Sequence, residues 1–300
     1  MRHQIDTRMG GHIKAFRHAT EPISARIAPD IQDDIIRRIL HKHPDVELLK
    51  IGSVGHKRVD DTHSDIDIAV KCDTIEHLYD IISDVFGDEL ATLESFYIVS
   101  YCHEYVDTFD NDETKYVQCD FMLSHDIDYT RFRYDCPDYA SDESRYKVGH
   151  KIMFMNMILN HCDEKNEGCD DTCYGKYDFS PIGLYRNVIS RTEYRLIRRE
   201  FVTTDVETIM HIPFDDADYS DFRSVESLWR TLHSDKFRYP DELRVIELNL
   251  FKNSYRKGWT HINPEDFKCT YWTTDEINEH LTLFKFEHVL NNMLINDSEK

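Results

Sequence analysis

Two aspartates separated by a single residue are the strongest chemical feature of the sequence. Asp65 and Asp67 alternate with Ile66, Ile68 and Val70, and this alternation is typical of a β-strand with one polar and one apolar face. The two carboxylates are therefore predicted to share one face of a sheet, with the core behind them. Like charges held this close raise each other's pKa, and a cation between them relieves the repulsion. The pair predicts a cation-binding site.

A glycine-serine pair precedes the aspartates. Gly52 and Ser53 follow a short apolar stretch, and eleven residues separate Ser53 from Asp65. Glycine lets backbone N–H groups approach a phosphate closely, and a serine hydroxyl can donate a hydrogen bond to it. Carboxylate oxygens at this spacing suit Mg²⁺, which is commonly bound by one or two carboxylates together with substrate phosphates. Residues 49–71 therefore predict a site for a metal ion and a triphosphate.

A second acidic strand is predicted further along the chain. Residues 116–123 also alternate, with one apolar face and one face that carries Asp120 between Gln118 and Met122. The preceding segment, 104–114, offers other carboxylates, including Asp107 and Glu113. Loop carboxylates are more often simply solvated, so the strand position favours Asp120 as the third acidic group of the site.

These features together resemble the signature of the DNA polymerase beta-like nucleotidyltransferase superfamily. In that pattern a Gly-Ser pair precedes an Asp-x-Asp pair, and a third carboxylate follows on a later strand. Arg58 and Ser64 also resemble the commoner residues of the intervening segment. The superfamily includes poly(A) polymerases, CCA-adding enzymes, oligonucleotide synthetases, aminoglycoside nucleotidyltransferases and protein-modifying toxins. The motifs do not distinguish among these subfamilies.

The resemblance implies a fold and a reaction. The fold is an α/β (α+β) catalytic lobe with a mixed sheet, followed by a mainly helical second lobe. Asp65 and Asp67 would hold two Mg²⁺ (or Mn²⁺) ions, Asp120 would complete one of the two metal sites, and Gly52 with Ser53 would position the β- and γ-phosphates. The enzyme would move a nucleoside monophosphate from a nucleoside triphosphate such as ATP to an acceptor hydroxyl, releasing pyrophosphate.

A predicted helix from Ser144 onward carries two further candidates for nucleotide binding. Lys147 and Lys151 lie four residues apart and therefore on one side of the helix. Lysines of the second lobe grip the β- and γ-phosphates in several members of the superfamily, and the resemblance implies this role here. The alternative is that both lysines face solvent, as lysines on amphipathic helices usually do.

The hydrophobic spacing predicts the order of the main elements. Helices are expected over residues 30–40 and 74–86, and strands over 46–51 and 93–101. The domain prediction is a loosely ordered leader over residues 1–28, a catalytic domain over 29–130 and a mainly helical domain over 131–300. Residues 191–199 are predicted to form a basic helix, which could contact phosphate or RNA backbone or could form internal salt bridges.

Four potential soft ligands fall within one acidic segment. His161, Cys162, Cys169 and Cys173 could hold zinc, although the tight C-x₂-C pair that is typical of zinc sites is missing. The surrounding acidic residues equally suggest a flexible loop. The sequence leaves these two readings open.

Composition limits the partners and the compartment. Lys and Arg total 36 against 57 Asp and Glu, so the net charge is −21, which opposes an extended polynucleotide footprint. The acceptor could be an RNA 3′ end, a protein or a small molecule, and a non-catalytic nucleotide-sensing protein is an alternative. No apolar run approaches the ~18 residues of a membrane span, and no secretory signal is recognisable, so a cytoplasmic protein without membrane partners is expected.

Overall fold

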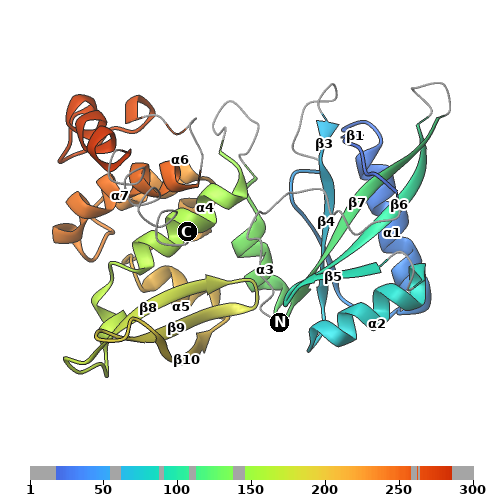
Figure 1. The fold of residues 1–300 in the computed structure, drawn as a ribbon, viewed down its shortest axis with the longest axis horizontal. Coiled ribbons are helices and arrows are strands. Elements are labelled where there is room, and N and C mark those ends of the chain that lie inside the picture. Colours follow the sequence, from blue (N-terminus) through green and yellow to red (C-terminus); the bar gives the residue numbers. More distant parts are fainter. Residues whose placement is uncertain are drawn as a thin grey trace, which may run out of the picture.

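The computed structural model describes residues 18–54, 62–87, 91–107, 113–137, 146–257, 262 and 264–285, without the side chains of 91–94. The fold is mixed α/β and contains a mixed sheet and an antiparallel sheet. Figure 1 shows two halves, each built around one of these sheets, with helix α3 (Ile127–Tyr134) between them. The domain boundary predicted at residue 130 falls within this helix.

The first half is a five-stranded sheet with the strand order β2-β4-β7-β6-β5. Strands β4 and β7 pair in parallel and the other neighbours pair antiparallel. Helices α1 and α2 cover one face of this sheet (Figure 1). The elements are α1 (Ala28–Lys42), β2 (Leu48–Ile51), β4 (Asp65–Lys71), α2 (Ile75–Phe86), β5 (Ala91–Ser95), β6 (Ile98–Asp107) and β7 (Glu113–Ser124).

Local sequence signals explain these helices. Pro29 occupies the first turn of α1, where a missing N–H costs nothing, and the apolar residues Ile31, Ile35 and Ile39 face the sheet at helical spacing. Thr74 caps α2 by accepting a hydrogen bond from the backbone N–H of His77 at 3.1 Å. The predicted helices and the strand over 46–51 are confirmed within a few residues. The single strand predicted over 93–101 is wrong, because the chain turns at residues 96–97 and β5 pairs antiparallel with β6.

The second half contains a three-stranded antiparallel sheet as well as helices, so the prediction of a mainly helical region is incomplete. The strand order is β10-β9-β8, and one face of this sheet packs against helix α4. The main elements are α4 (Val148–Leu159), β8 (Cys173–Ser180), β9 (Gly183–Ser190), β10 (Leu196–Thr203), α5 (Val206–His211), α6 (Val225–Leu232) and α7 (Leu243–Arg256). The same half contains the short 3₁₀ helices η1 (Asp163–Asn166), η2 (Tyr219–Phe222), η3 (Pro240–Glu242) and η4 (Pro264–Asp266).

The basic helix predicted over residues 191–199 is wrong. These residues form the turn between β9 and β10 and the first half of β10. Tyr194 has a positive φ of 51°, which no helix accommodates, and the backbone of 196–203 pairs with β9 instead. The cross-strand partners of residues 196–199 lie in β9, 7 to 12 residues earlier in the chain, and therefore outside the segment whose helical spacing was considered.

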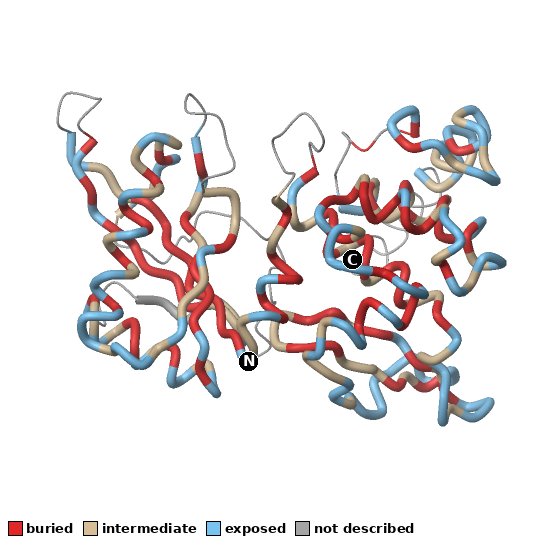
Figure 2. The backbone as a smooth tube through the Cα atoms, turned by 180° about the vertical axis from the view of Figure 1, so that it is seen from behind, coloured by how far each residue is buried: buried red, intermediate tan, exposed pale blue. Residues whose placement is uncertain are grey.

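The second face of the first sheet is turned toward the second half of the molecule. Ile51, Ala69 and Met122 lie on this face and belong to the same hydrophobic cluster as α3, α4 and the inner face of the three-stranded sheet. In Figure 2 buried residues run along the central strands of the first half and around α4 in the second half. Side chains on this second face of β4 and β7 therefore lie between the two halves.

Part of the predicted leader over residues 1–28 packs against the first half. Residues 1–17 lie outside the described residues, but β1 (Ile23–Ser24) pairs with β3 (Thr62–His63), and Ile23 is fully buried. The segment 18–27 therefore packs against the first half, which differs from the prediction of a loosely ordered leader. Across the described ranges, no helix combines the length and apolar character needed to cross a membrane.

Candidate functional site

The structure brings the three predicted carboxylates together. Asp65, Asp67 and Asp120 each offer a carboxylate oxygen, and these oxygens lie within 4.8 Å of one another. Asp120 is buried, whereas Asp65 and Asp67 are partly exposed. A divalent cation could bind all three groups at once. In the described ranges this is the one place where three or more His, Cys, Asp or Glu side chains converge in this way.

The parallel pairing of β4 and β7 creates the cluster. Asp67 is the direct partner of Asp120, and Asp65 is the partner of Gln118. Paired residues on adjacent strands point to the same face. The carboxylates therefore meet because of the alternation within each strand and the register between the two strands. Helix α1 anchors this register, because Gln32 Nε2 donates a hydrogen bond to the backbone carbonyl of Asp67 at 2.9 Å.

The electrostatics of the cluster favour a bound cation. Burial raises the pKa of Asp67 well above its usual range, and the negative charges of Asp65 and Asp120 raise it further. A divalent cation reverses this effect, because its charge favours the ionised carboxylates. The donor set consists of hard carboxylate oxygens, which suits Mg²⁺ or Mn²⁺.

Gly52 lies directly against Asp67. Its φ of 80° is in the left-handed region, and a Cβ built on it would lie 2.1 Å from Asp67 Oδ2. The preceding residue, Ile51, pairs with Asp67 across the β2–β4 ladder. Only glycine allows the backbone to turn this close to the carboxylate. The Gly-Ser turn therefore borders the carboxylate cluster, as predicted.

Ser53 is held by a histidine that sequence reasoning did not identify. Ser53 Oγ and His63 Nδ1 are 2.8 Å apart, and His63 is fully buried. This contact fixes the hydroxyl group beside the turn. His63 lies two residues before Asp65, so the period-two alternation could have placed it on the same face of the chain, but no motif marked it.

Two neighbours orient the carboxylate of Asp120. Ser100 Oγ donates a hydrogen bond to Asp120 Oδ1 at 2.6 Å, and Gln118 Nε2 lies 3.0 Å from both carboxylate oxygens. All three residues are buried. Gln118 was predicted to share a face with Asp120, but Ser100 depends on the register between β6 and β7 and left no local signal in the sequence.

Helix α3 brings side chains of the second half close to the cluster. Tyr134 is buried at the end of this helix, burial raises its pKa, and the charge of Asp67 raises it further while Arg133 lowers it. Arg133 is itself buried, donates from Nε to the Phe179 carbonyl at 3.0 Å and stacks 4.5 Å from the centre of the Tyr134 ring. Tyr134, which the sequence did not identify, therefore lies near Asp67. Arg133, which with Arg131 follows the last acidic strand and was a candidate for binding the triphosphate or for a solvated surface position, is instead buried against the Tyr134 ring and the Phe179 carbonyl.

Lys147 and Lys151 occupy different environments. Lys147 is exposed at the N-cap of α4. Lys151 is almost completely buried, and its amino group donates to the carbonyls of Phe132, at 2.8 Å, and Asp135. The Lys151 amino group therefore binds backbone carbonyls in this structure. This differs from its expected role in gripping phosphates, because those hydrogen bonds and the surrounding core hold it inside the second half.

Lys151 is expected to make stability depend on pH in an alkaline range. Burial lowers the pKa of Lys151 from 10.5 to about 8, so between these values the unfolded chain binds more protons than the folded chain. Stability contributed by this group should therefore rise with pH, by up to about 3 kcal/mol. The unfolding free energy of wild type relative to Lys151→Met, measured by urea denaturation from pH 8 to 10.5, should increase by that amount. Lys147→Met is the matched control, and an equal pH dependence in both variants would contradict the assignment.

The four potential zinc ligands do not converge. His161 Nδ1 lies 2.8 Å from Glu242 Oε2, and the buried Cys162 thiol donates to the Ile158 carbonyl at 3.5 Å. Cys169 and Cys173 neighbour each other, and the described residues hold no third ligand atom converging with theirs. The structure therefore favours structural roles for these side chains.

Of the alternative third carboxylates, Asp107 forms an ion pair with Lys115 at 3.1 Å, and residues 108–112 lie outside the described residues.

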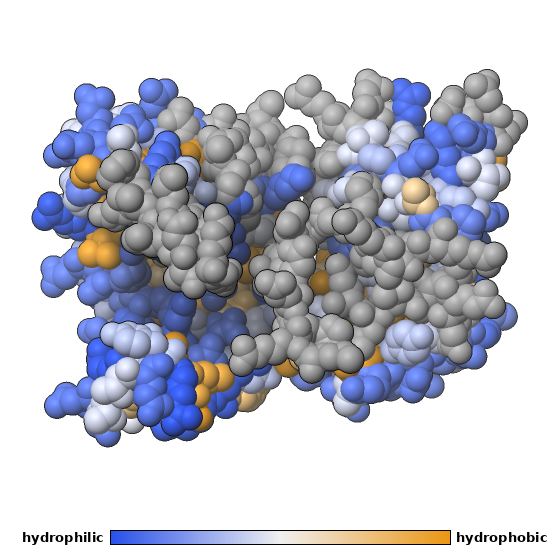
Figure 3. Space-filling view, in the orientation of Figure 1, coloured by the Kyte–Doolittle hydropathy of each residue, from blue (hydrophilic) through white to orange (hydrophobic). Residues whose placement is uncertain are grey.

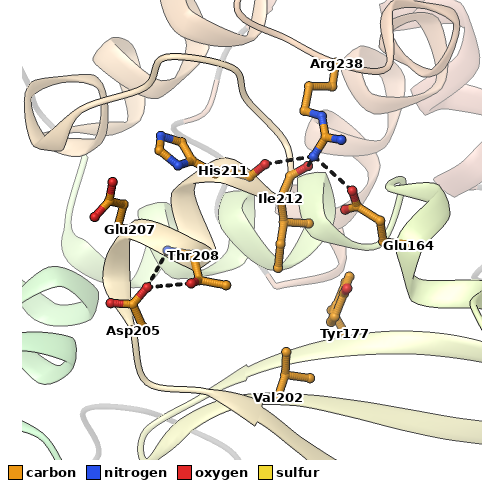
Figure 4. Close-up of a pocket in the computed structure, with 9 residues that line it drawn as sticks. All are labelled: Glu164, Tyr177, Val202, Asp205, Glu207, Thr208, His211, Ile212 and Arg238. Carbon is orange, nitrogen blue, oxygen red and sulfur yellow. Dashed lines mark hydrogen bonds and ion pairs between the residues drawn. The ribbon is translucent and has the colours of Figure 1, made fainter.

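A pocket of about 560 Å³ lies in the second half, away from the carboxylate cluster (Figure 4). Tyr177, Val202 and Ile212 line it with apolar surface. Its polar groups are engaged with one another: Arg238 pairs with Glu164 at 2.9 Å and donates to the His211 carbonyl, and Asp205 caps helix α5 through Thr208. No residue predicted to bind metal or nucleotide lines this pocket, so it carries no functional assignment here.

Comparison with known proteins gives no independent assignment. The chain matches no protein-family model, and no curated protein shows significant similarity to it. The functional interpretation therefore depends on the residues and geometry of the site.

Proposed function

We propose that this chain is a metal-dependent nucleotidyltransferase. It transfers a nucleoside monophosphate from a nucleoside triphosphate to an acceptor hydroxyl and releases pyrophosphate. One observation carries the proposal: Asp65, Asp67 and Asp120 converge within 4.8 Å on two adjacent parallel strands, directly against the Gly52 turn. Carboxylates that are merely exposed to water would not require a glycine packed against one of their oxygens.

The carboxylates would hold the metal ions. When bound there, two divalent ions would supply Lewis-acid stabilisation of charge on the attacking and leaving oxygens. Asp67 lies between Asp65 on its own strand and Asp120 on the neighbouring one, so it is the residue best placed to ligate both ions. Ser100 and Gln118 hold the Asp120 carboxylate in a fixed orientation, which reduces the reorganisation needed when ions and substrate arrive.

The remaining groups would bind and orient the triphosphate. The Gly52-Ser53 turn would offer backbone N–H groups to a phosphate beside Asp67. The Ser53 hydroxyl would donate to a phosphate oxygen when His63 Nδ1, 2.8 Å away, carries a proton and donates to Ser53 Oγ. The acceptor oxygen attacks the α-phosphorus, the bond from that phosphorus to the bridging oxygen of pyrophosphate breaks, and the acceptor proton passes to a carboxylate of the cluster or to water. Tyr134 borders the carboxylates from the opposite half.

The acceptor class is decided by experiment. The purified protein is incubated with each of the four ribonucleoside triphosphates, labelled on the α-phosphate, with Mg²⁺ or Mn²⁺. Total RNA, a protein lysate and a metabolite extract are supplied separately as acceptors. Label entering one fraction, together with released pyrophosphate, supports the proposal and identifies the acceptor class. Nucleotide binding without transfer to any fraction favours a nucleotide-sensing protein.

The proposed reaction requires a compartment that supplies nucleoside triphosphates and Mg²⁺, and we place the protein in the cytoplasm.

Gln118→Leu is expected to reduce transfer without unfolding the protein. Leucine matches the volume of glutamine and its buried surroundings, but it leaves Asp120 without the Nε2 donor. Loss of a group that orients a metal ligand typically costs roughly 10- to 100-fold in activity or metal affinity. Pyrophosphate release should fall by that factor and should recover partly at higher Mn²⁺ concentration. A change in melting temperature with an unaltered rate would show that Gln118 has only a structural role.

A further inference from the structure

The segment that forms the three-stranded sheet is basic, although the chain as a whole is acidic. Residues 173–203 contain six Lys or Arg side chains and three Asp or Glu, a net charge of +3, against −21 for the whole chain. The inner face of this sheet is buried against α4, through residues such as Phe179, Leu184 and Val188. The cations and aromatics considered next lie on the opposite, outer face or beside it.

Strand register arranges the outer face in rows. Tyr185 pairs with Phe201, and the next row toward the other end pairs Asn187 with Lys176 and Arg199. The row beyond that contains Tyr174 with Ile189 and Leu196. The two rows that carry aromatic rings are four residues apart along a strand, or about 13 Å. Hydrophobic rows therefore flank a row that contains cations. In Figure 3 hydrophobic and strongly hydrophilic side chains lie next to each other at the lower edge of this half.

Phe201 is the exposed aromatic ring of this face, and Tyr185 and Tyr174 are half-buried. Phe201 is 58% exposed, and its ring packs edge-on against Tyr185 with ring centres 5.5 Å apart. Arg199 stacks 3.8 Å from the centre of the Tyr185 ring and bonds to Asp178 at 2.9 Å and to the Tyr97 hydroxyl at 3.3 Å. An exposed ring fixed in this way loses little conformational freedom when a planar ligand stacks on it.

The cations leave a positive surplus on this face. Asp178, Glu193 and Glu200 each pair with an arginine of the same sheet or its turn. Within the described part of the chain, Lys176 and Arg191 form no ion pair with a carboxylate, and Arg191 lies over the Tyr174 ring at 5.4 Å. A polyanion would complement this local surplus of positive charge.

We propose that the outer face of β8, β9 and β10 binds single-stranded RNA by stacking bases on Tyr185, Phe201 and Tyr174 while Lys176 and Arg191 contact phosphates. Exposed rings that accept stacked bases and a basic surface that follows the backbone are the two components of non-specific single-strand binding. The RNA would be the acceptor or a guide to it, and this part of the inference rests on the proposed transferase function. The binding itself does not.

The test is fluorescence anisotropy of the full-length protein with a labelled single-stranded RNA of about 12 nucleotides, a length within the usual range of single-strand binding sites. Measurements are made in EDTA without nucleotide, between about 50 and 200 mM salt. Phe201→Ala and Tyr185→Ala are each expected to weaken binding roughly 5- to 150-fold. Arg191→Ala should reduce the salt dependence. Tyr271→Ala, which removes a tyrosine that is 48% exposed outside the sheet, is the matched control and should bind as wild type does.

The outcomes separate this proposal from the catalytic one. Asp67→Asn should bind the RNA as tightly as wild type, because the cluster does not contribute to the sheet, so loss of transfer and loss of binding are independent. Duplex RNA should compete poorly, since its bases are not available for stacking. Absence of RNA binding by wild type, equal binding by the Phe201 and Tyr271 variants, or equal affinity for the duplex would overturn the proposal. A change in sedimentation with Phe201→Ala, at unchanged RNA affinity, would assign the face to a protein contact instead.

Discussion

Asp67→Asn is expected to lower the rate of nucleotidyl transfer at least about a thousandfold while stabilising the metal-free protein. The loss in rate follows because the asparagine side chain cannot carry the charge that holds divalent ions, whose contribution to the transition state is several kcal/mol. The gain in stability follows because Asp67 is the residue whose pKa is raised by burial and by Asp65 and Asp120. Rate is measured by pyrophosphate release and stability by urea denaturation in EDTA.

The same variant should remove a pH dependence. A carboxyl group whose folded pKa exceeds its unfolded value binds more protons in the folded chain, so stability falls as pH rises through the interval between the two values. Metal-free wild type should therefore lose stability as pH increases above the ordinary pKa of 3.8, and Asp67→Asn should lose less. Asp73→Asn, which changes an exposed aspartate just beyond the same strand, is the control. Equal pH profiles for all three proteins would contradict the electrostatic argument.

Gly52→Ala is expected to be the most destabilising of the conservative changes at the site. The φ of 80° is itself strained for alanine, and the new Cβ would lie 2.1 Å from Asp67 Oδ2 and 2.9 Å from Asp67 Cβ and Cγ. Backbone strain of this kind costs roughly 1–3 kcal/mol, and the clash with a carboxylate held in the β4 strand adds to it. We expect the variant to lose metal binding as well, because relief of the clash moves Asp67.

Gly87→Ala separates the two contributions to this effect. Gly87 has a φ of 95°, but a Cβ there would meet nothing within 4 Å. Its substitution should cost only the backbone strain and should leave transfer unchanged. Urea denaturation of both variants measures the difference. If the two substitutions cost the same free energy of unfolding, the close approach of Gly52 to Asp67 has no energetic consequence and the argument for a built phosphate turn fails.

The parts of the site that lie on one strand could be predicted, since they depend on local alternation. The period of two placed Asp65 and Asp67 on one face and Asp120 on the polar face of its own strand. That Asp67 lies opposite Asp120 depends on a parallel pairing between strands about fifty residues apart, and only the resemblance to a known motif suggested it. Ser100 was not identifiable, because its contact with Asp120 arises from a third strand.

Two errors have a common physical cause. Lys151 shares a helical stripe with Lys147, but the packing of α3 against α4 buries only Lys151 and supplies backbone carbonyls to its amino group. Residues 191–199 contain many good helix formers, but β9 offers cross-strand partners to Leu196, Arg198 and Arg199. In both cases tertiary contacts overrode a correct local pattern. The pairing of β10 with β9 also created the outer face of the sheet. A helix over the same residues would have distributed the cations differently.

The most direct test of the central claim is a titration with Mn²⁺, followed by electron paramagnetic resonance, in the presence of a non-hydrolysable nucleoside triphosphate analogue. We expect wild type to bind two ions per chain with the analogue, and Asp67→Asn to bind neither under the same conditions. The Asp73→Asn control should bind as wild type does. Failure of wild type to bind Mn²⁺, or equal binding by Asp67→Asn, would contradict the assignment of Asp65, Asp67 and Asp120 as a metal and triphosphate site.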